Sequence, residues 1–355
     1  MFILFSIVIA IVFLYGIEYV PEGNKDYAGK EQANAIKGFF ILFLTVGHII
    51  GLLSTNNLYP EGIGNNLEYW LHMNCNQLVV VMFLFFSGYG VSESIKKSRP
   101  DEVSGGGYIK SFPRRRILGT WLNYAIGVTV FLLLTPLTGK QIEWENLPLY
   151  YLGLRKVGNP TWYIMVILIC YSMTWLIATI VKRNRRALVI YHTLMVAVAG
   201  FVLYLQMDEY WYDTIMCYAL GFAYSQYKEE LESIIKKNYV FSSVLTLALF
   251  FAGYVIVKRT SLPLLISFNF WALCFAMIFM IFGMKLKVGN RFINWCGKHL
   301  FPIYMYQGLF FHILFNIGGE KHSFAAWSPF LYTLLSVILS IVLAHFYRLW
   351  EVKLK

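Results

Sequence analysis

The chain has 355 residues, of which 58% are hydrophobic and 14% charged, and it carries a formal net charge of +11. This composition excludes a water-soluble globular domain, because its mean hydropathy of +0.57 lies far above the soluble range. The basic residues lie in short segments between apolar stretches, so we expect them to set membrane topology and we expect no nucleic-acid partner. The predicted solvent is the lipid bilayer.

Apolar stretches of roughly 17 to 22 residues recur along the whole chain, and each can cross about 30 Å of hydrocarbon at about 1.5 Å per residue. They predict an all-α fold, a polytopic transmembrane helical bundle of about eleven helices. The first stretch lacks a basic segment and a small-residue cleavage site, so we expect a retained helix rather than a signal peptide. The predicted helices cover 1–20, 36–54, 74–95, 117–135, 160–181, 187–205, 210–227, 238–257, 263–284, 298–317 and 327–348.

Lys and Arg residues alternate in density from one connection to the next. The first, third and every further odd-numbered connection, from 21–35 to the tail from Arg348, together hold 23 Lys and Arg residues. The connections between them hold six. Short loops rich in Lys and Arg stay in the cytoplasm. The pattern therefore predicts a multi-pass protein of the bacterial cytoplasmic membrane, with its N-terminus outside and its C-terminus cytoplasmic.

The spacing of cysteine and histidine residues predicts no metal centre. The five cysteines lack C-x-x-C spacing and lie in apolar sequence, and the seven histidines lack H-x-x-x-H spacing on one helix. We therefore expect packing cysteines, no metal and no bound cofactor.

Two ionisable residues stand in the second predicted helix. Lys37 and His48 are eleven residues apart, so they lie within about 20° of one helix face and roughly 16 Å apart along the axis. Ionisable residues within a membrane helix indicate function by default. The structural alternatives are a lysine that extends its ammonium to the interface and a hydrogen-bonded packing histidine.

Three arginines, Arg114, Arg115 and Arg116, directly precede the predicted helix 117–135 on the cytoplasmic side. Guanidinium groups suit phosphate oxygens. Retention of a cytoplasmic loop and contact with anionic lipid would explain the same run.

Polar and aromatic side chains interrupt three further apolar helices. They are Gln77 and Ser87 in the third, Trp162 and Tyr163 at the start of the fifth, and Tyr304 and Gln307 in the tenth. Tyr304 and Gln307 are one turn apart and share a face, whereas His312, about 140° further round, is expected to face elsewhere. Taken singly, such residues also serve as helix contacts or as an aromatic belt.

Five segments occur in an order that is similar to one known family. They are Lys37-Gly38 with Val46-Gly47-His48, Phe83-Leu84-Phe85-Phe86-Ser87-Gly88-Tyr89, Arg114-Arg115-Arg116, Trp162-Tyr163, and Gly297-Lys298-His299-Leu300-Phe301-Pro302-Ile303-Tyr304. Together they resemble the signatures of the acyltransferase-3 family of integral-membrane O-acyltransferases. The resemblance covers about residues 31–348, and Gln307 stands where that family often has a histidine. It implies a ten-helix membrane domain at 31–355 and an additional helix and loop at 1–30.

The resemblance implies transfer of an acyl group, usually acetyl, from cytoplasmic acyl-CoA as co-substrate to a hydroxyl of a cell-envelope sugar or glycan. Lys37 and the three arginines would bind the negatively charged nucleotide end of acetyl-CoA. His48 would act as general base or as acyl carrier. The residues expected to contact the substrates are Ser87, Trp162, Tyr163, Tyr304 and Gln307.

Two other classes of function stay open from the sequence alone. A transporter or flippase of a lipid-linked sugar would show broken helices, inverted repeats and paired intramembrane charges, and no repeat is visible. A membrane scaffold would need none of the aligned polar groups. The sequence leaves open the identity of the acceptor and whether the protein forms a homo-oligomer.

Overall fold

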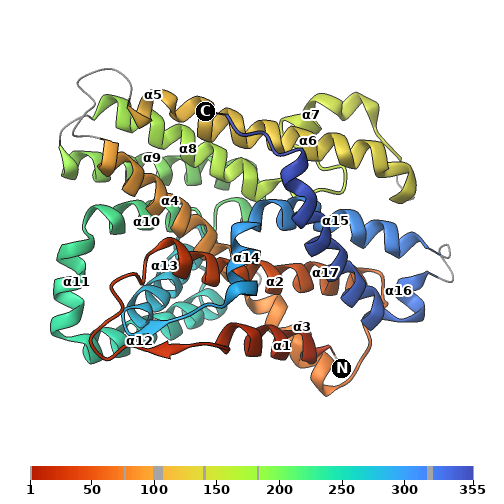
Figure 1. The fold of residues 1–355 in the computed structure, drawn as a ribbon, viewed down its shortest axis with the longest axis horizontal. Helices are drawn as coiled ribbons and strands as arrows, with labels where there is room; N and C mark the ends of the chain where they lie inside the picture. Colours follow the sequence, from red (N-terminus) through yellow and green to blue (C-terminus); the bar gives the residue numbers. More distant parts are fainter. Residues whose placement is uncertain are drawn as a thin grey trace.

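The computed structural model describes residues 2–75, 77–98, 107–138, 141–181, 184–317 and 323–354. Each of the eleven predicted stretches contains a helix, and eight helical stretches of the described residues are long and apolar enough to cross a membrane. The helices found in the eleven predicted stretches are α1 (Ile3–Leu14), α2 (Lys30–Thr55), α4 (Leu78–Ser98), α6 (Gly119–Leu134), α8 (Trp162–Ile180), α9 (Arg185–Gln206), α10 (Met216–Gln226), α12 (Tyr239–Arg259), α13 (Leu264–Gly283), α15 (Leu300–Asn316) and α17 (Pro329–Phe346). The predicted polytopic α-helical bundle is confirmed (Figure 1).

Two of these helices are much shorter than the sequence predicts. Helix α1 has 12 residues and α10 has 11, so α1 rises only about 18 Å. Helix α1 ends at Leu14 because the chain turns at Gly16, which has a left-handed φ of 84°, and enters a strand. Helix α10 begins six residues late because a short 3-10 turn precedes it. The helices expected at 1–20 and 210–227 were therefore too long.

Short elements fill connections that the sequence treats as loops. Their residues are too few or too polar for the hydrophobic pattern of a membrane helix. They are α3 (Ile63–Cys75), α5 (Tyr108–Phe112), α7 (Leu147–Tyr151), α11 (Lys228–Lys237), α14 (Arg291–Lys298), α16 (Phe324–Trp327), the π-helix η2 (Pro113–Leu118), the 3-10 turns η3 (Thr135–Thr138), η4 (Trp144–Asn146), η5 (Glu209–Trp211) and η6 (Tyr347–Leu349), and the paired strands β1 (Glu18–Tyr19) and β2 (Leu286–Lys287).

Reciprocal glycine contacts hold two helix pairs at close range. A Cβ at Gly88 of α4 would overlap the carbonyl oxygen of Tyr218 in α10, and a Cβ at Gly221 of α10 would overlap that of Phe85 in α4. Helices α2 and α14 meet in the same way, Gly38 against Ile293 and Gly297 against Asn34. Small residues let membrane helices approach closely. Glycines of three predicted motifs thus fix the helices that carry the candidate site.

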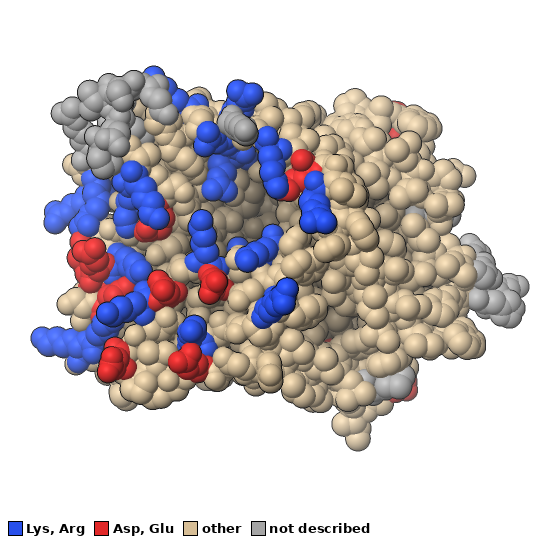
Figure 2. Space-filling view, viewed as in Figure 1, with Lys and Arg blue, Asp and Glu red and all other residues tan. Residues whose placement is uncertain are grey.

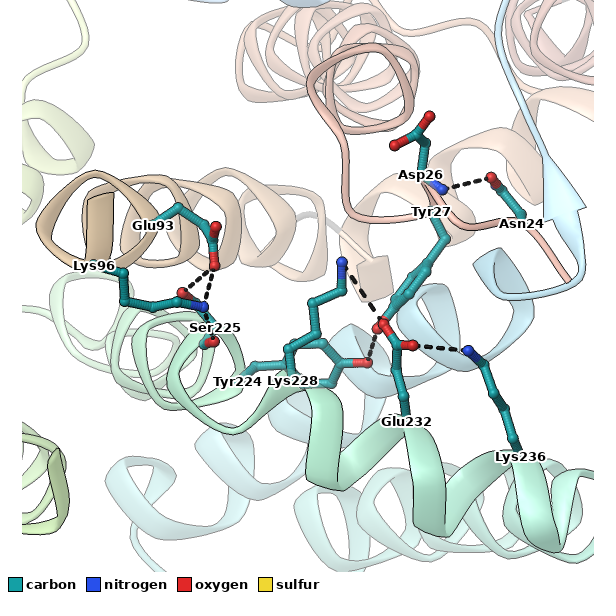
Figure 3. A network of polar contacts seen from close by, with 10 residues as sticks. All are labelled: Asn24, Asp26, Tyr27, Glu93, Lys96, Tyr224, Ser225, Lys228, Glu232 and Lys236. Carbon is teal, nitrogen blue, oxygen red and sulfur yellow. Dashed lines mark hydrogen bonds and ion pairs between the residues drawn. The ribbon is translucent and has the colours of Figure 1, made fainter. Parts of the chain in front are cut away.

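The connections rich in Lys and Arg contact one another at one end of the molecule. The hydroxyl groups of Tyr27 and Tyr224 lie 2.7 Å apart, and Lys96 donates to Glu93 and to the Ser225 carbonyl oxygen (Figure 3). Burial, together with the Tyr224 contact, raises the pKa of the Tyr27 phenol. In Figure 1 this end carries α5 and α11, and Figure 2 shows Lys and Arg gathered over the same half of the molecule.

The connections poor in Lys and Arg also contact one another. The side chain of Asn269, at the start of α13, donates to the Tyr212 carbonyl oxygen at 2.8 Å. The backbone N–H of Phe2 donates to Asn65 Oδ1, also at 2.8 Å. At these two points, residues in or next to connections that the sequence assigns to one side of the membrane therefore lie close together.

Candidate active site

His48 lines a cavity of about 450 Å³, here called the His48 cavity. Its wall comes from α2, the residue Gln77 before α4, the segment leading into α8, and α15. Gln307 and Trp162 line it as well, so three of the predicted site residues share one space. His312 lines the same cavity, and the expectation that it faces elsewhere was wrong. Residues 307 and 312 border the cavity from successive turns of α15, because the cavity extends along the helix.

The side-chain amide of Gln307 makes only part of the hydrogen bonds that it can form. Its Nε2 donates to the Tyr304 carbonyl oxygen at 3.2 Å, while the buried Oε1 has no hydrogen-bond partner of normal geometry among the described residues. Gln307 and Lys156 line the cavity together with His48, and the His72 ring packs against Gly47, the residue before His48. A buried polar group without a partner is costly. Gln307 is therefore available to orient His48 or a substrate.

A second cavity, of about 660 Å³, is strongly cationic and is here called the basic cavity. Among the described residues, its charged lining consists of Arg115, Arg116, Lys298, Arg348, Lys353 and one acid, Glu351. Figure 2 shows a hollow rimmed by Lys and Arg side chains. Cations converging on a concave surface attract phosphate-bearing ligands. Two of the three predicted arginines, Arg115 and Arg116, thus share a cavity with the end of α14 and the C-terminal tail.

Local structure explains how the arginines and the tail reach the basic cavity. The arginines lie in the π-helix η2, whose widened turn changes the direction of successive side chains, and Arg116 Nε donates to the Tyr108 hydroxyl at 3.2 Å. Asn123 fixes the tail, because its side chain donates to the Val352 carbonyl oxygen and accepts from the Val352 N–H, both at 2.9 Å. The Tyr347 hydroxyl also donates to Asn123 Oδ1.

A thin aromatic wall separates the two cavities. Tyr163 lines the basic cavity, whereas its neighbour Trp162 lines the His48 cavity. The centroids of the two rings lie 6.0 Å apart. Tyr304 packs edge-on against Tyr163 at 5.4 Å and is 1% exposed. Ser87 lines the basic cavity beside the Tyr163 phenol. The predicted substrate residues therefore lie in this wall or on its two surfaces.

Two predicted cation sites lie elsewhere. In the described part of the chain, Lys37 and Arg114 line neither cavity. Lys37 sits on α2 next to Gly38, where α14 packs, about 16 Å along the axis from His48. Roles for Lys37 and Arg114 in donor binding stay predictions.

A buried acid–histidine pair next to His48 escaped the sequence analysis. His72 Nε2 lies 3.1 Å from Glu68 Oε1, which also accepts from the Ser6 hydroxyl at 2.8 Å, and both members of the pair are at most 1% exposed. The His72 ring stacks on Phe43 at 4.0 Å and fills the space beside Gly47. The i, i+4 spacing of Glu68 and His72 would have indicated the pair had a helix been expected there.

The family of the chain is shown by comparison with known proteins. The acyltransferase-3 family, described as an acyltransferase domain, matches residues 31–346. The fold and this match define a membrane-embedded acyltransferase. The chain belongs to the acyltransferase-3 family. No curated protein and no solved structure gives a significant match to it.

Proposed function

We propose that this membrane acyltransferase moves an acetyl group from cytoplasmic acetyl-CoA to a hydroxyl of a cell-envelope sugar or glycan. The observation that carries the proposal is the arrangement of the two cavities, one cationic and one holding His48, on opposite surfaces of a single aromatic wall. Membership in an acyltransferase family favours this function over the transporter or flippase alternative. The proposal places the basic cavity on the cytoplasmic side of the bacterial membrane.

The donor would bind with its phosphates in the basic cavity. Arg115, Arg116 and Lys298 supply charge-assisted hydrogen bonds from separate elements, which together fix a large polyanion more precisely than one loop can. The thin pantetheine arm would then extend along Ser87 and Tyr163 towards the wall. Displacement of the Tyr163 and Tyr304 rings would bring the thioester to the His48 cavity.

His48 would take the proton of the acceptor hydroxyl. As the hydroxyl oxygen bonds to the thioester carbonyl carbon, its proton passes to the imidazole, and collapse of the tetrahedral species breaks the carbon–sulfur bond. The coenzyme A thiolate leaves and takes up that proton. Gln307, which lines the same cavity as His48, would donate a hydrogen bond to the oxyanion through the second N–H of its Nε2 group. In the alternative course, His48 itself attacks the thioester and carries the acyl group to the acceptor.

The test is the transfer of labelled acetyl from acetyl-CoA to the alkali-labile ester fraction of envelope glycans in membranes that contain the protein. We expect His48→Ala to abolish this transfer while acetyl-CoA still binds, because the basic cavity is untouched. Rapid quenching in denaturant near neutral pH, where an acyl-imidazole survives longest, separates the two courses, since only an acyl carrier accumulates label on the protein. Undiminished transfer by the His48→Ala protein would overturn the proposal.

A further inference from the structure

A third cavity, of about 620 Å³, lies between two connections that are poor in Lys and Arg, and is here called the loop cavity. One wall is the segment from Gln141 to Thr161, which includes η4 and α7, and the other is the segment from Met207 to Trp211. His312 of α15 lines it as well. Its volume lies in the range of small-molecule sites, about 300 to 1,000 Å³.

The loop cavity is continuous in its lining with the His48 cavity. The residues that line both are Lys156, Gly158, Thr161, Tyr210 and His312. Among the described residues, none lines both the loop cavity and the basic cavity. A ligand in the loop cavity therefore reaches His48 without passing the space assigned to the donor.

The lining of the loop cavity combines aromatic rings with carboxylate and hydroxyl groups. Trp211 and Tyr150 are 7% and 4% exposed, so their rings are held by packing, and Tyr150 is tied by its carbonyl oxygen to the Tyr124 hydroxyl at 2.8 Å. Asp208 Oδ2 accepts from the Tyr210 hydroxyl at 2.8 Å. The Tyr210 ring lies edge-on to Trp162 at 6.0 Å, which joins the aromatic set to the His48 cavity.

The charges of the lining favour a neutral, hydroxyl-rich ligand. Among the lining residues that the structure describes, the acids Glu143 and Asp208 balance the cations Arg155 and Lys156, so these side chains have no excess of either sign. Glu143 and Arg155 are both 59% exposed and lie 3.9 Å apart, so ligand hydroxyl groups can replace this weak pairing at little cost. A nucleotide would meet two carboxylates, and a lipid tail would bury charged groups without partners.

We propose that the loop cavity binds the acceptor as a neutral carbohydrate, with a sugar ring against Trp211 and Tyr210 and its hydroxyl groups on Glu143 and Asp208. This inference rests on the proposed function and assigns the acceptor its place. The ring of a neutral sugar has apolar C–H faces that pack on aromatic rings and an equatorial belt of hydroxyl groups that pair with carboxylates. The hydroxyl to be acylated would point past Thr161 and His312 into the His48 cavity.

The test is saturation-transfer NMR on the purified full-length protein in detergent, with methyl α-D-glucopyranoside and methyl N-acetyl-β-D-glucosaminide as neutral probes and D-glucuronate as the charged probe. We expect at least one neutral glycoside to receive saturation, and the double variant Glu143→Gln with Asp208→Asn to weaken its binding about tenfold. Both side chains are exposed, so the fold should tolerate these changes.

The matched control is Glu145→Gln with Glu209→Gln. These acids are neighbours of the two lining acids, are exposed, and do not line the loop cavity. We expect this double variant to bind the glycoside as the unaltered protein does. Acetyl-CoA binding is measured in parallel and should be equal in both double variants.

Three outcomes would overturn the inference. They are the absence of saturation transfer to both neutral glycosides, binding of glucuronate in preference to them, and equal loss of binding in the two double variants. The His48→Ala transfer experiment is independent of these results. A protein that loses transfer with His48 but binds no neutral sugar would keep the proposed function and refute the loop cavity as its carbohydrate site.

Discussion

The basic cavity and the His48 cavity differ in almost every property although one layer of aromatic rings separates them. Among the described residues, the first is lined by five cations and one acid and is built from a π-helix, the end of α14 and the C-terminal tail. In the same part of the chain, the second is lined by one cation, Lys156, and by imidazole, amide and aromatic groups of α2, α15, η5 and the entry to α8. Under the proposed function, the peripheral segments bind the charged donor, and the core helices carry the residues that react.

The largest effect is expected from removing the imidazole. His48→Ala should lower acetyl transfer by about 10³-fold, because a positioned general base contributes about 10²- to 10⁴-fold. Acetyl-CoA affinity, measured by equilibrium binding, should stay within about twofold. The control His345→Ala removes an exposed histidine that lines neither cavity and should keep full transfer. Loss of donor binding in the His48→Ala protein would show that the two regions are not separate.

The next largest effect, on stability, is expected at the contact between α4, which carries Ser87, and α10. Gly88→Ala would push a methyl group into the Tyr218 carbonyl oxygen, so we expect a loss of stability of about 3 kcal/mol, seen as a lower midpoint of thermal unfolding in detergent. Gly90→Ala, two residues along α4, meets no atom within 4 Å and should leave the midpoint unchanged. A stable Gly88→Ala protein would contradict the close packing of α4 on α10.

A smaller effect, confined to the donor, is expected from the arginines. Arg115→Gln with Arg116→Gln should raise the KM for acetyl-CoA about tenfold or more and weaken its dependence on salt, with little change in kcat. Arg114→Gln tests the same run at a residue that lines neither cavity and should change KM by less than twofold. Equal effects of all three arginines would favour a role in topology or lipid contact instead.

The smallest effect is expected at α11, remote from both cavities. Partial burial raises the pKa of Glu232, but hydrogen bonds from Lys236 and Tyr27 and nearby Lys228 outweigh it, so its pKa is lowered (Figure 3). A carboxyl with a lowered folded-state pKa stabilises the fold above its unfolded pKa and loses this contribution as the pH falls through the folded value. Glu232→Gln should therefore flatten the acid limb of the stability–pH curve by less than about 1 kcal/mol.

Thermal unfolding between pH 3 and 7 measures this effect. Acetyl transfer at pH 7 should be unchanged. Glu229→Gln, an exposed position on the same helix, should leave the curve as it is. The loss of stability in the Glu232→Gln protein should be largest near neutral pH and vanish in acid, so a loss that grows as the pH falls would reverse the expected sign.

The sequence predicted the long helices well because a membrane span leaves a strong signal, about twenty apolar residues between polar loops. The short amphipathic helices escaped, and with them the Glu68–His72 pair on α3. Helix α1 was overestimated because apolar residues continue past Leu14 although the backbone turns at Gly16. Periodicity does not report such a turn.

Part of the candidate site was predictable from the motifs. His48 and Trp162, which stand in two of the five family segments, line one cavity together with Gln307, which stands where the family often has a histidine. Arg348 and Lys353 of the tail joined the basic cavity through contacts with Asn123, which lies more than two hundred residues earlier. Such long-range pairing leaves no local pattern. The helix geometry by which Lys37 and His48 share one face of α2 is correct. However, one face of a long helix meets different neighbours at different depths, so the two side chains need not line the same cavity.

The most direct test of the central claim is a sided transfer assay. Native membranes that contain the protein are prepared as inside-out and right-side-out vesicles, labelled acetyl-CoA is added outside, and orientation is checked by trypsin cleavage at the exposed Arg185 and Arg186. The account predicts ester label in the glycan fraction only when the face bearing the basic cavity is accessible, and none in either preparation with His48→Ala. Equal labelling from both faces, or labelling that survives the loss of His48, would contradict it.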